Sequence, residues 1–144
     1  MIDLITNAKA YARQCHRGQQ DDTGKNYFKA HIEQVVQIVK KVTDDPEIIA
    51  AAYLHDTIED TKTTIFELYE QFGQRVALLV YELTHEGDKK EGYYFPRLQS
   101  KEAILIKFAD RLSNLSRMET WGIKRQKQYI RKSHFWSNAP SPRV

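Results

Sequence analysis

The chain has 144 residues, a formal net charge of +3 and one cysteine, Cys15. This length suits a single domain with its own hydrophobic core, and a lone cysteine excludes an internal disulfide. The small positive charge is too weak to indicate a nucleic-acid partner and suits an anionic small molecule equally well. No apolar run is long enough to span a membrane, and the first residues lack the regions of a signal peptide, so we expect a cytoplasmic protein.

Apolar residues recur at helical spacing along most of the chain, and no segment alternates convincingly like a strand. A first helix is predicted by one apolar face, formed by Leu4, Ile5, Ala8, Tyr11, Ala12 and Cys15. Residues 18–29 are polar and predict a loop. The apolar face of a second helix is formed by Ile32, Val35, Val36, Val39 and Val42.

The third predicted helix is apolar nearly all round, so it should be central and buried. Asp45 and Pro46 have the residue types of an N-cap and a first helical position. Residues 48–54 form the apolar body of this helix, and His55 and Asp56 lie at its C-terminal end.

Further helices are predicted in the second half of the chain. Thr64 and Glu67 fit a capping box, and Gly73 should end the helix that they begin. The next two helices are marked by apolar periodicity at Val76, Leu79, Val80 and Leu83 and then at Ile104, Leu105, Phe108, Leu112 and Leu115. Residues 85–94 predict a polar loop, and residues 124–136 predict a last helix.

These elements define an all-α chain, which we expect to be a single bundle of about six to eight helices. Residues 1–136 form the predicted domain. Residues 137–144 contain two prolines and small polar residues, so we expect a frayed tail there.

Ionisable residues fall on faces that should be buried, namely at His31, His55, Asp56 and Asp110. A lone charged carboxylate among apolar side chains is costly to bury, and a metal ion would offset that cost. Two imidazoles and two carboxylates suit Mn²⁺, Fe²⁺ or Zn²⁺ better than Ca²⁺, and without a cysteine ligand a closed structural zinc site is not expected. The alternative is a coincidence of buried hydrogen-bonded pairs.

Two carboxylates, Glu59 and Asp60, follow the pair His55 and Asp56. Glu59 comes four residues after His55 and three after Asp56, so a continuing helix would place all three on one side. A carboxylate beside a metal can take a proton from an attacking water or orient that water. The alternative is a solvated helix end. The combination predicts metal-dependent hydrolysis of a phosphoester or pyrophosphate.

Other charged residues allow two interpretations each. Lys107 and Arg111 flank Asp110, and each could reach a phosphate or be solvated. His85 and His134 are interpreted as surface or cap residues. The basic residues of the last predicted helix are more typical of a solvated face than of a nucleic-acid patch, so no nucleic-acid partner is expected.

In its motifs the chain resembles the HD-domain hydrolases of the RelA/SpoT type, especially the stand-alone small alarmone hydrolases similar to the metazoan SpoT homologue. The matching segments, in the family's order, are 16–19 (HRGQ), 54–61 (LHDTIEDT), 72–80 (FGQRVALLV), 83–84 (LT) and 106–114 (IKFADRLSN). The resemblance runs from about residue 5 to 118, which is nearly the whole predicted domain.

The resemblance implies an all-helical HD fold and one Mn²⁺ held by His31, His55, Asp56 and Asp110. It gives Glu59 and Asp60 the role of activating the attacking water, and Asn114 matches a position that contacts the nucleotide. The other candidates for substrate contact are His16, Arg17, Lys107, Arg111 and Arg117. The implied reaction is hydrolysis of the 3′-pyrophosphate of (p)ppGpp to GDP or GTP and pyrophosphate. A nucleotide is thus the expected partner, and the oligomeric state stays open.

The chain departs from the family pattern where the substrate should be read. Asp21 and Asp22 stand where these hydrolases commonly carry basic residues, and Ser116 and Arg117 follow where Arg-Thr is frequent. A one-residue shift also precedes His31, where the usual Pro-Tyr falls on residues 26–27 or 27–28.

These departures keep two alternatives open beside the alarmone hydrolase. The first is an HD phosphohydrolase for another nucleotide, such as NADPH, an adenine alarmone or a nucleoside phosphate. The second is a non-catalytic nucleotide-binding module, for which Glu59 and Asp60 would not be needed.

Overall fold

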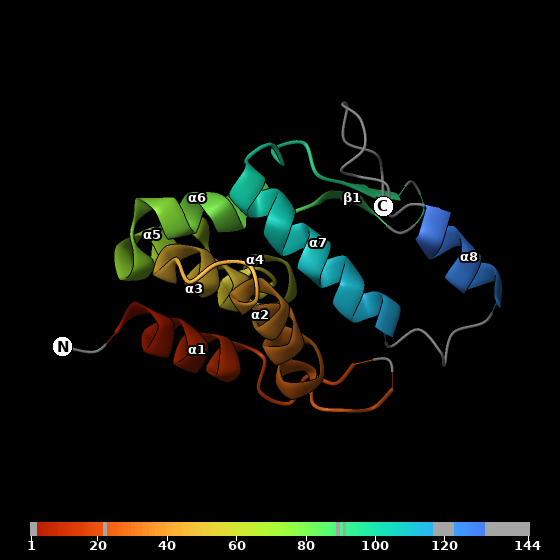
Figure 1. Cartoon of the computed structure of the whole chain (residues 1–144), viewed down its shortest axis with the longest axis horizontal. Coiled ribbons are helices and arrows are strands. Elements are labelled where there is room, and N and C mark those ends of the chain that lie inside the picture. Colours follow the sequence, from red (N-terminus) through yellow and green to blue (C-terminus); the bar gives the residue numbers. More distant parts are fainter. Residues whose placement is uncertain (1–2, 22, 89, 91, 117–122, 132–144) are drawn as a thin grey trace.

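The computed structural model describes residues 3–21, 23–88, 90, 92–116 and 123–131. Helices dominate these residues, as the apolar periodicity predicts (Figure 1). The helices are α1 (Leu4–Cys15), η1 (Phe28–Ile32), α2 (Glu33–Lys40), α3 (Pro46–Leu54), α4 (Thr57–Asp60), α5 (Ile65–Phe72), α6 (Gln74–Glu82), α7 (Lys101–Ser116) and α8 (Ile123–Arg131).

Helix α3 forms the centre of the fold, which confirms its prediction as the buried helix. Its residues from Ile48 to Leu54 are all buried, and α1, α2 and α6 pack around it (Figure 1). Asp45 caps the helix by accepting a hydrogen bond from the backbone N–H of Glu47 at 2.9 Å, and Pro46 occupies the first helical position. The helix therefore begins at a defined cap, and its body is buried inside the bundle.

The segment before α2 begins with the π-helical turn η1, which carries His31. A π turn holds one more residue than an α turn, and such turns often lie at functional sites. His31 lies in this turn with its side chain buried. Helix α2 ends at Lys40, so Val42 lies beyond it and is 68% exposed, and its prediction as part of the apolar face is wrong.

The junction of α5 and α6 is built as the sequence predicts. Thr64 accepts a hydrogen bond from the backbone N–H of Glu67 at 3.2 Å. Gly73 ends α5 and precedes α6 with φ of +92°, a conformation that residues with a Cβ rarely adopt.

Helix α7 exists as predicted, but its buried face differs from the predicted one. Phe108 and Leu112 are 37% and 43% exposed, although the apolar periodicity places them in the core. The buried face is formed by Ala103, Ile106, Ala109, Asp110, Arg111 and Ser113. Several of these side chains are small, which allows α7 to pack closely on α2 and brings Asp110 to His31.

The predicted loop at 85–94 contains a short antiparallel hairpin of β1 (Glu86–Asp88) and β2 (Gly92–Tyr94). The expectation that no segment forms a strand is therefore wrong here. Each strand has three residues and the first reads Glu-Gly-Asp, so no alternation of apolar and polar residues could show it. The hairpin runs beside α7 in Figure 1, on the side away from α1.

The C-terminal predictions are only partly covered by the structure. Helix α8 covers residues 123–131 of the predicted last helix. The rest of that helix, the tail at 137–144, His134, Arg117 and Asp22 lie outside the described residues. Among the described helices, none combines the length and the apolar character needed to cross a membrane.

Candidate metal centre and active site

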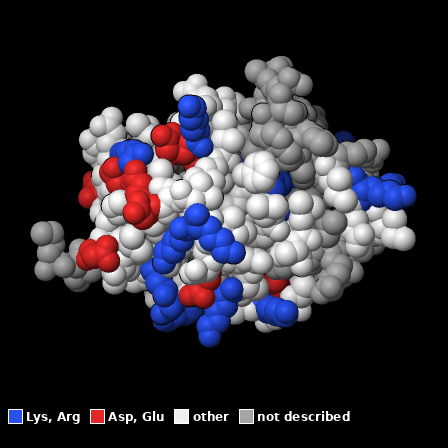
Figure 2. Space-filling view, viewed as in Figure 1, with Lys and Arg blue, Asp and Glu red and all other residues white. Residues whose placement is uncertain are grey.

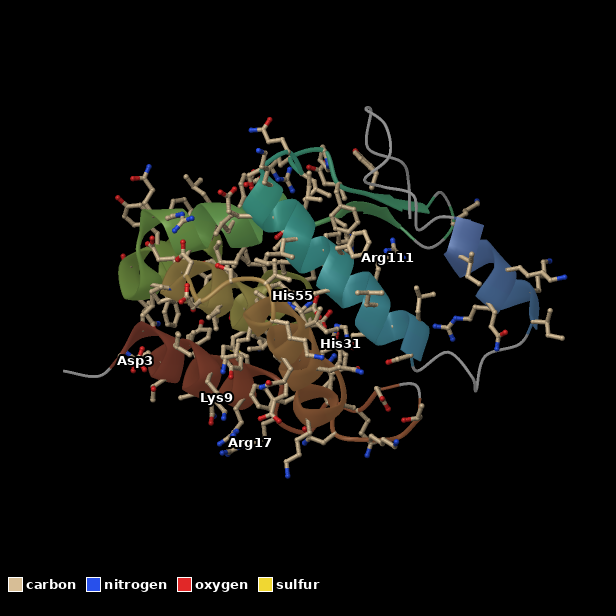
Figure 3. The ribbon with its side chains drawn as sticks, in the orientation of Figure 1. Asp3, Lys9, Arg17, His31, His55 and Arg111 are labelled. Atoms are coloured by element: carbon tan, nitrogen blue, oxygen red, sulfur yellow. The ribbon has the colours of Figure 1, made fainter. Side chains whose placement is uncertain are left out.

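The structure brings His31, His55, Asp56 and Asp110 together from η1, the end of α3 and the middle of α7. One ligand atom from each of these residues lies within 4.8 Å of the other three. The Nε2 atom of His31 is 2.9 Å from Oδ1 of Asp110, and Nε2 of His55 is 3.2 Å from Oδ2 of Asp56. Figure 3 shows His31 and His55 next to each other beneath α7. The expected set is therefore a cluster in space.

Both imidazoles are held through the nitrogen that does not face the carboxylates. Nδ1 of His55 lies 2.7 Å from the carbonyl oxygen of Ala52, which can only accept, so Nδ1 carries the hydrogen. Nδ1 of His31 lies 2.9 Å from Oγ of Ser113, whose hydroxyl donates to Oε1 of Gln34 at 2.7 Å. His31 therefore also donates from Nδ1. In their neutral forms both rings present the lone pair of Nε2 to the cluster.

This arrangement needs positive charge at its centre, because imidazole lone pairs facing carboxylate oxygens repel one another. Burial disfavours the charged imidazole of His55, but Asp56 and Asp110 raise its pKa well above the usual value. Burial likewise opposes ionisation of Asp110, yet the charge of Lys107 and bonds to the two histidines lower its pKa well below the usual value. A divalent cation satisfies the same demand, and the mixed nitrogen and oxygen donors suit one. The four residues thus fit a metal ion.

Two further side chains bond the carboxylates of the cluster. The Tyr27 hydroxyl donates to Oδ2 of Asp56 at 2.6 Å, and Nζ of Lys107 lies 3.2 Å from Oδ2 of Asp110. Burial and the charge of Asp56 raise the pKa of Tyr27 far above its usual value, so the phenol stays a donor. The sequence allowed either a phosphate contact or solvation for Lys107 and predicted no role for Tyr27. In the structure both side chains bond carboxylates of the cluster and so orient them.

Glu59 lies beside the cluster, but not on a helix continuous with His55. Helix α3 ends at Leu54 and α4 begins at Thr57, so no single helix carries both His55 and Glu59. The carboxylate of Glu59 is bonded by His85: Oε2 lies 2.8 Å from Nε2, and Oε1 accepts the backbone N–H at 3.2 Å. Burial raises the pKa of Glu59. The prediction of His85 as a surface or cap residue missed this contact.

Asp60, the last residue of α4, is held by the loop that follows α1. The side-chain amide of Gln19 donates to Oδ2 of Asp60 at 3.2 Å, and Oε1 of Gln19 accepts from Nδ1 of His16 at 2.8 Å. Burial and then the charge of Asp56 raise the pKa of Asp60. His16 is only 1% exposed, so the alternative of a surface histidine does not hold.

Arg17 is separated from this cluster. With Arg13, Lys29 and His16 it lines a pocket of about 210 Å³ between the end of α1 and η1. Figure 3 shows Arg17 pointing outward, away from His31 and His55, and Figure 2 shows Lys and Arg side chains gathered along this edge of the molecule. Contact of Arg17 with a substrate stays a prediction.

The remaining candidates for substrate contact lie on α7. Asn114 is half-buried one turn after Asp110. Arg111 is buried, and in the view of Figure 3 it lies across the helix from His31 and His55. Their contacts with a nucleotide stay predictions.

Two of the residues that depart from the family pattern make local hydrogen bonds. Oδ1 of Asp21 accepts the backbone N–H groups of Thr23 and Lys25, each at 2.9 Å, and so shapes its own loop. The Ser116 hydroxyl donates to the carbonyl oxygen of Ser113 at 2.7 Å. Both residues therefore stabilise the local backbone.

The family model described as HD domain matches residues 8–92. The chain belongs to the HD-domain family. The adjacent pair His55 and Asp56 lies within the matched residues and in the metal-type cluster.

The relatives of the chain are of the RelA/SpoT type. It is 35% identical over 133 residues to a guanosine-3′,5′-bis(diphosphate) 3′-pyrophosphohydrolase of Aquifex aeolicus, covering 86% of this chain and 19% of the relative. It is 33% identical over 140 residues to a GTP pyrophosphokinase rsh of Brucella melitensis, covering 89% of this chain and 18% of the relative. The chain thus spans about a fifth of the length of the curated relatives that it matches.

A solved structure covers most of both chains. It is described as a metazoan ortholog of SpoT that hydrolyzes ppGpp, and it matches with a TM-score of 0.77 and 30% identity. The match covers 90% of this chain and 81% of the other. The all-α HD fold and the RelA/SpoT-type resemblance are thereby confirmed.

Proposed function

We propose that the protein hydrolyses the 3′-diphosphate of ppGpp or pppGpp, giving GDP or GTP and pyrophosphate. The observation that carries this proposal is the joining of the four-residue cluster with two carboxylates, Glu59 and Asp60, on the helix that follows it. The names of the relatives support the choice of substrate. A cytoplasmic location would suit both the nucleotide and the free thiol of Cys15.

The metal that we propose is Mn²⁺, held by His31, His55, Asp56 and Asp110. Two nitrogen and two oxygen donors suit Mn²⁺, and Fe²⁺ or Zn²⁺ would suit the same donors. When bound, the cation would neutralise phosphate charge and polarise the attacking water.

The residues of the chain supply the proton chemistry. Glu59 accepts a proton from the water while the water oxygen forms a bond to the phosphorus attached to the ribose. The bond between that phosphorus and the 3′ oxygen breaks, and the 3′ oxygen takes up a proton to become a hydroxyl. Asp60 orients the water from the neighbouring position. Because burial raises the pKa of Glu59, this carboxylate is a stronger base than an exposed one.

The test is to load purified protein with Mn²⁺, Fe²⁺ or Zn²⁺, add ppGpp and separate the products by anion-exchange chromatography. We expect GDP and pyrophosphate in equal amounts. Glu59→Gln should lower kcat by about 10²- to 10⁴-fold, because it removes the proton acceptor, while Mn²⁺ binding persists. If none of the three metals gave turnover, the proposal would be refuted. A fully active Glu59→Gln would refute the role given to this residue.

A second candidate substrate class is favoured by one observation. The loop after α1 carries Asp21 where related hydrolases commonly carry a basic residue, and a carboxylate cannot attract phosphate or stack on a base as arginine does. The candidates are NADPH, an adenine alarmone or a nucleoside phosphate. Comparing kcat/KM for these compounds with that for ppGpp decides between the two, and a clear preference for ppGpp would eliminate the second.

A further inference from the structure

One residue, His85, bonds both oxygens of the Glu59 carboxylate. The imidazole Nε2 lies 2.8 Å from Oε2, and the backbone N–H donates to Oε1 at 3.2 Å. A carboxylate oxygen has two lone-pair directions, so this double contact uses one on each oxygen and leaves one on each for another donor. His85 therefore fixes the rotation of the carboxylate as well as its position.

The position of His85 is itself fixed by the segment between α6 and the hairpin. Thr84, the residue before it, donates from its hydroxyl to the carbonyl oxygen of Val80 at 3.0 Å. Arg97 donates to the carbonyl oxygen of Thr84 at 3.1 Å. The imidazole packs edge-on against the buried ring of Phe95, with the ring centroids 6.1 Å apart. The imidazole is thus anchored on the side that does not face Glu59.

Charged groups from two other elements act on the pair formed by Glu59 and His85. Asp56, which precedes α4, and Lys107 on α7 influence both members. The hydrogen bond to Glu59 raises the pKa of His85, although burial opposes this. The bond also lowers the pKa of Glu59, against the stronger effect of burial.

We propose that His85 is a positioning residue, which holds Glu59 in the orientation that accepts the proton from the attacking water. This inference rests on the proposed hydrolysis. His85 follows the matching segment 83–84 and precedes the next one at 106–114, so the motifs of the resemblance do not account for a histidine at position 85. A simple structural contact would need only one bond, whereas here the side chain and the backbone of one residue hold the two oxygens of the proposed proton acceptor.

The test compares His85→Leu, which removes the imidazole donor, with His85→Gln, which keeps a neutral donor. Glu86→Gln, in the next residue along, is the matched control, because Glu86 is exposed and the amide oxygen of glutamine can still accept a hydrogen bond from Arg97. With ppGpp and Mn²⁺ we expect His85→Leu to lower kcat by about 10- to 100-fold with little change in KM. His85→Gln should recover most of this loss, and Glu86→Gln should match the wild type.

The pH profile separates positioning from a general loss of structure. Without the hydrogen bond from His85 the pKa of Glu59 rises further, so the acidic limb of kcat should move to higher pH in His85→Leu. In His85→Gln the acidic limb of kcat should stay near the pH at which it lies in the wild type. Thermal unfolding of each variant shows whether it folds. If His85→Leu does not fold, His85→Asn, whose amide is shorter, replaces it.

A measurement without substrate distinguishes the failure of this inference from that of the proposed function. The ¹⁵N NMR titration of the His85 ring should have a higher midpoint in the wild type than in Glu59→Gln. If the wild type does not hydrolyse ppGpp, the proposed function fails. A higher titration midpoint in the wild type would then show only that His85 and Glu59 form an ion pair, and the role of His85 in the hydrolysis would fail with the proposed function. If the wild type is active but His85→Leu keeps its kcat and its acidic limb, the positioning role is overturned.

Discussion

Ser113 offers a sharp test of the metal centre, because its hydroxyl accepts the Nδ1 hydrogen of His31 at 2.9 Å. Ser113 is fully buried. Ser113→Ala removes this acceptor, so the neutral ring would favour the other tautomer. That tautomer places its hydrogen on Nε2, which lies 2.9 Å from Oδ1 of Asp110 and can donate to it. The hydrogen would then occupy the position where a metal must bind.

The size of the effect follows from this tautomer change. Leaving a buried donor unsatisfied costs about 1–3 kcal/mol, and metal binding would force the ring back into that state. We therefore expect the Kd for Mn²⁺ to rise by about 5- to 150-fold in Ser113→Ala. This range agrees with the loss of about 10- to 100-fold typical when a partner of a metal ligand is removed.

The matched control for this prediction is Ser116→Ala, which makes the same substitution one turn later on α7. The Ser116 hydroxyl bonds Gln34 and the carbonyl oxygen of Ser113. Isothermal titration of both metal-free variants with Mn²⁺ measures the two Kd values. We expect Ser116→Ala to bind like the wild type. Equal affinity of the two variants would refute the argument that Ser113 sets the tautomer of His31.

Two further predictions concern the support of the active site and the capping of the central helix. Gln19→Leu should lower kcat for ppGpp by about 10- to 100-fold without weakening Mn²⁺ binding, because Asp60 loses its amide donor; wild-type kcat would contradict this. Asp45→Ala should lower the free energy of unfolding by about 1 kcal/mol in urea titrations, whereas Asp44→Ala, at the exposed neighbour, should not. Hydrogen bonding to Arg75 lowers the pKa of Asp45, so its contribution is present above the unfolded pKa of about 4 and is lost as the pH falls below it. A difference between Asp45→Ala and the wild type that persisted undiminished in acid would contradict this sign.

The metal-type cluster could be predicted from sequence because its residues sit in helices with clear periodicity. His55 and Asp56 end a helix that is apolar on all sides, and such a helix has to lie in the core. A polar pair at its end must then find polar partners, and His31 and Asp110 were the candidates on other buried faces. Local rules of capping and burial were sufficient for this step.

The partners of Glu59 and of the carboxylate oxygens could not be predicted in the same way. His85 lies in a segment whose strands are too short to show a pattern, so nothing in the sequence indicates that the chain turns back toward α4. The buried face of α7 was misjudged for a related reason. Phe108 and Leu112 are larger and more apolar than Ala109 and Ser113, but close packing on α2 requires the small side chains.

The geometry of α4 explains why Glu59 and Asp60 need separate supports. Consecutive residues on a helix point about 100° apart, so one neighbouring element cannot hold both carboxylates. Glu59 is held by His85, which precedes the hairpin, and Asp60 by Gln19, in the loop after α1. These two segments lie at opposite edges of the bundle in Figure 1. The helices thus position the proposed metal ligands, while two separate loops position the two carboxylates proposed to act on the water, and a change in either loop should alter catalysis without disturbing the metal centre.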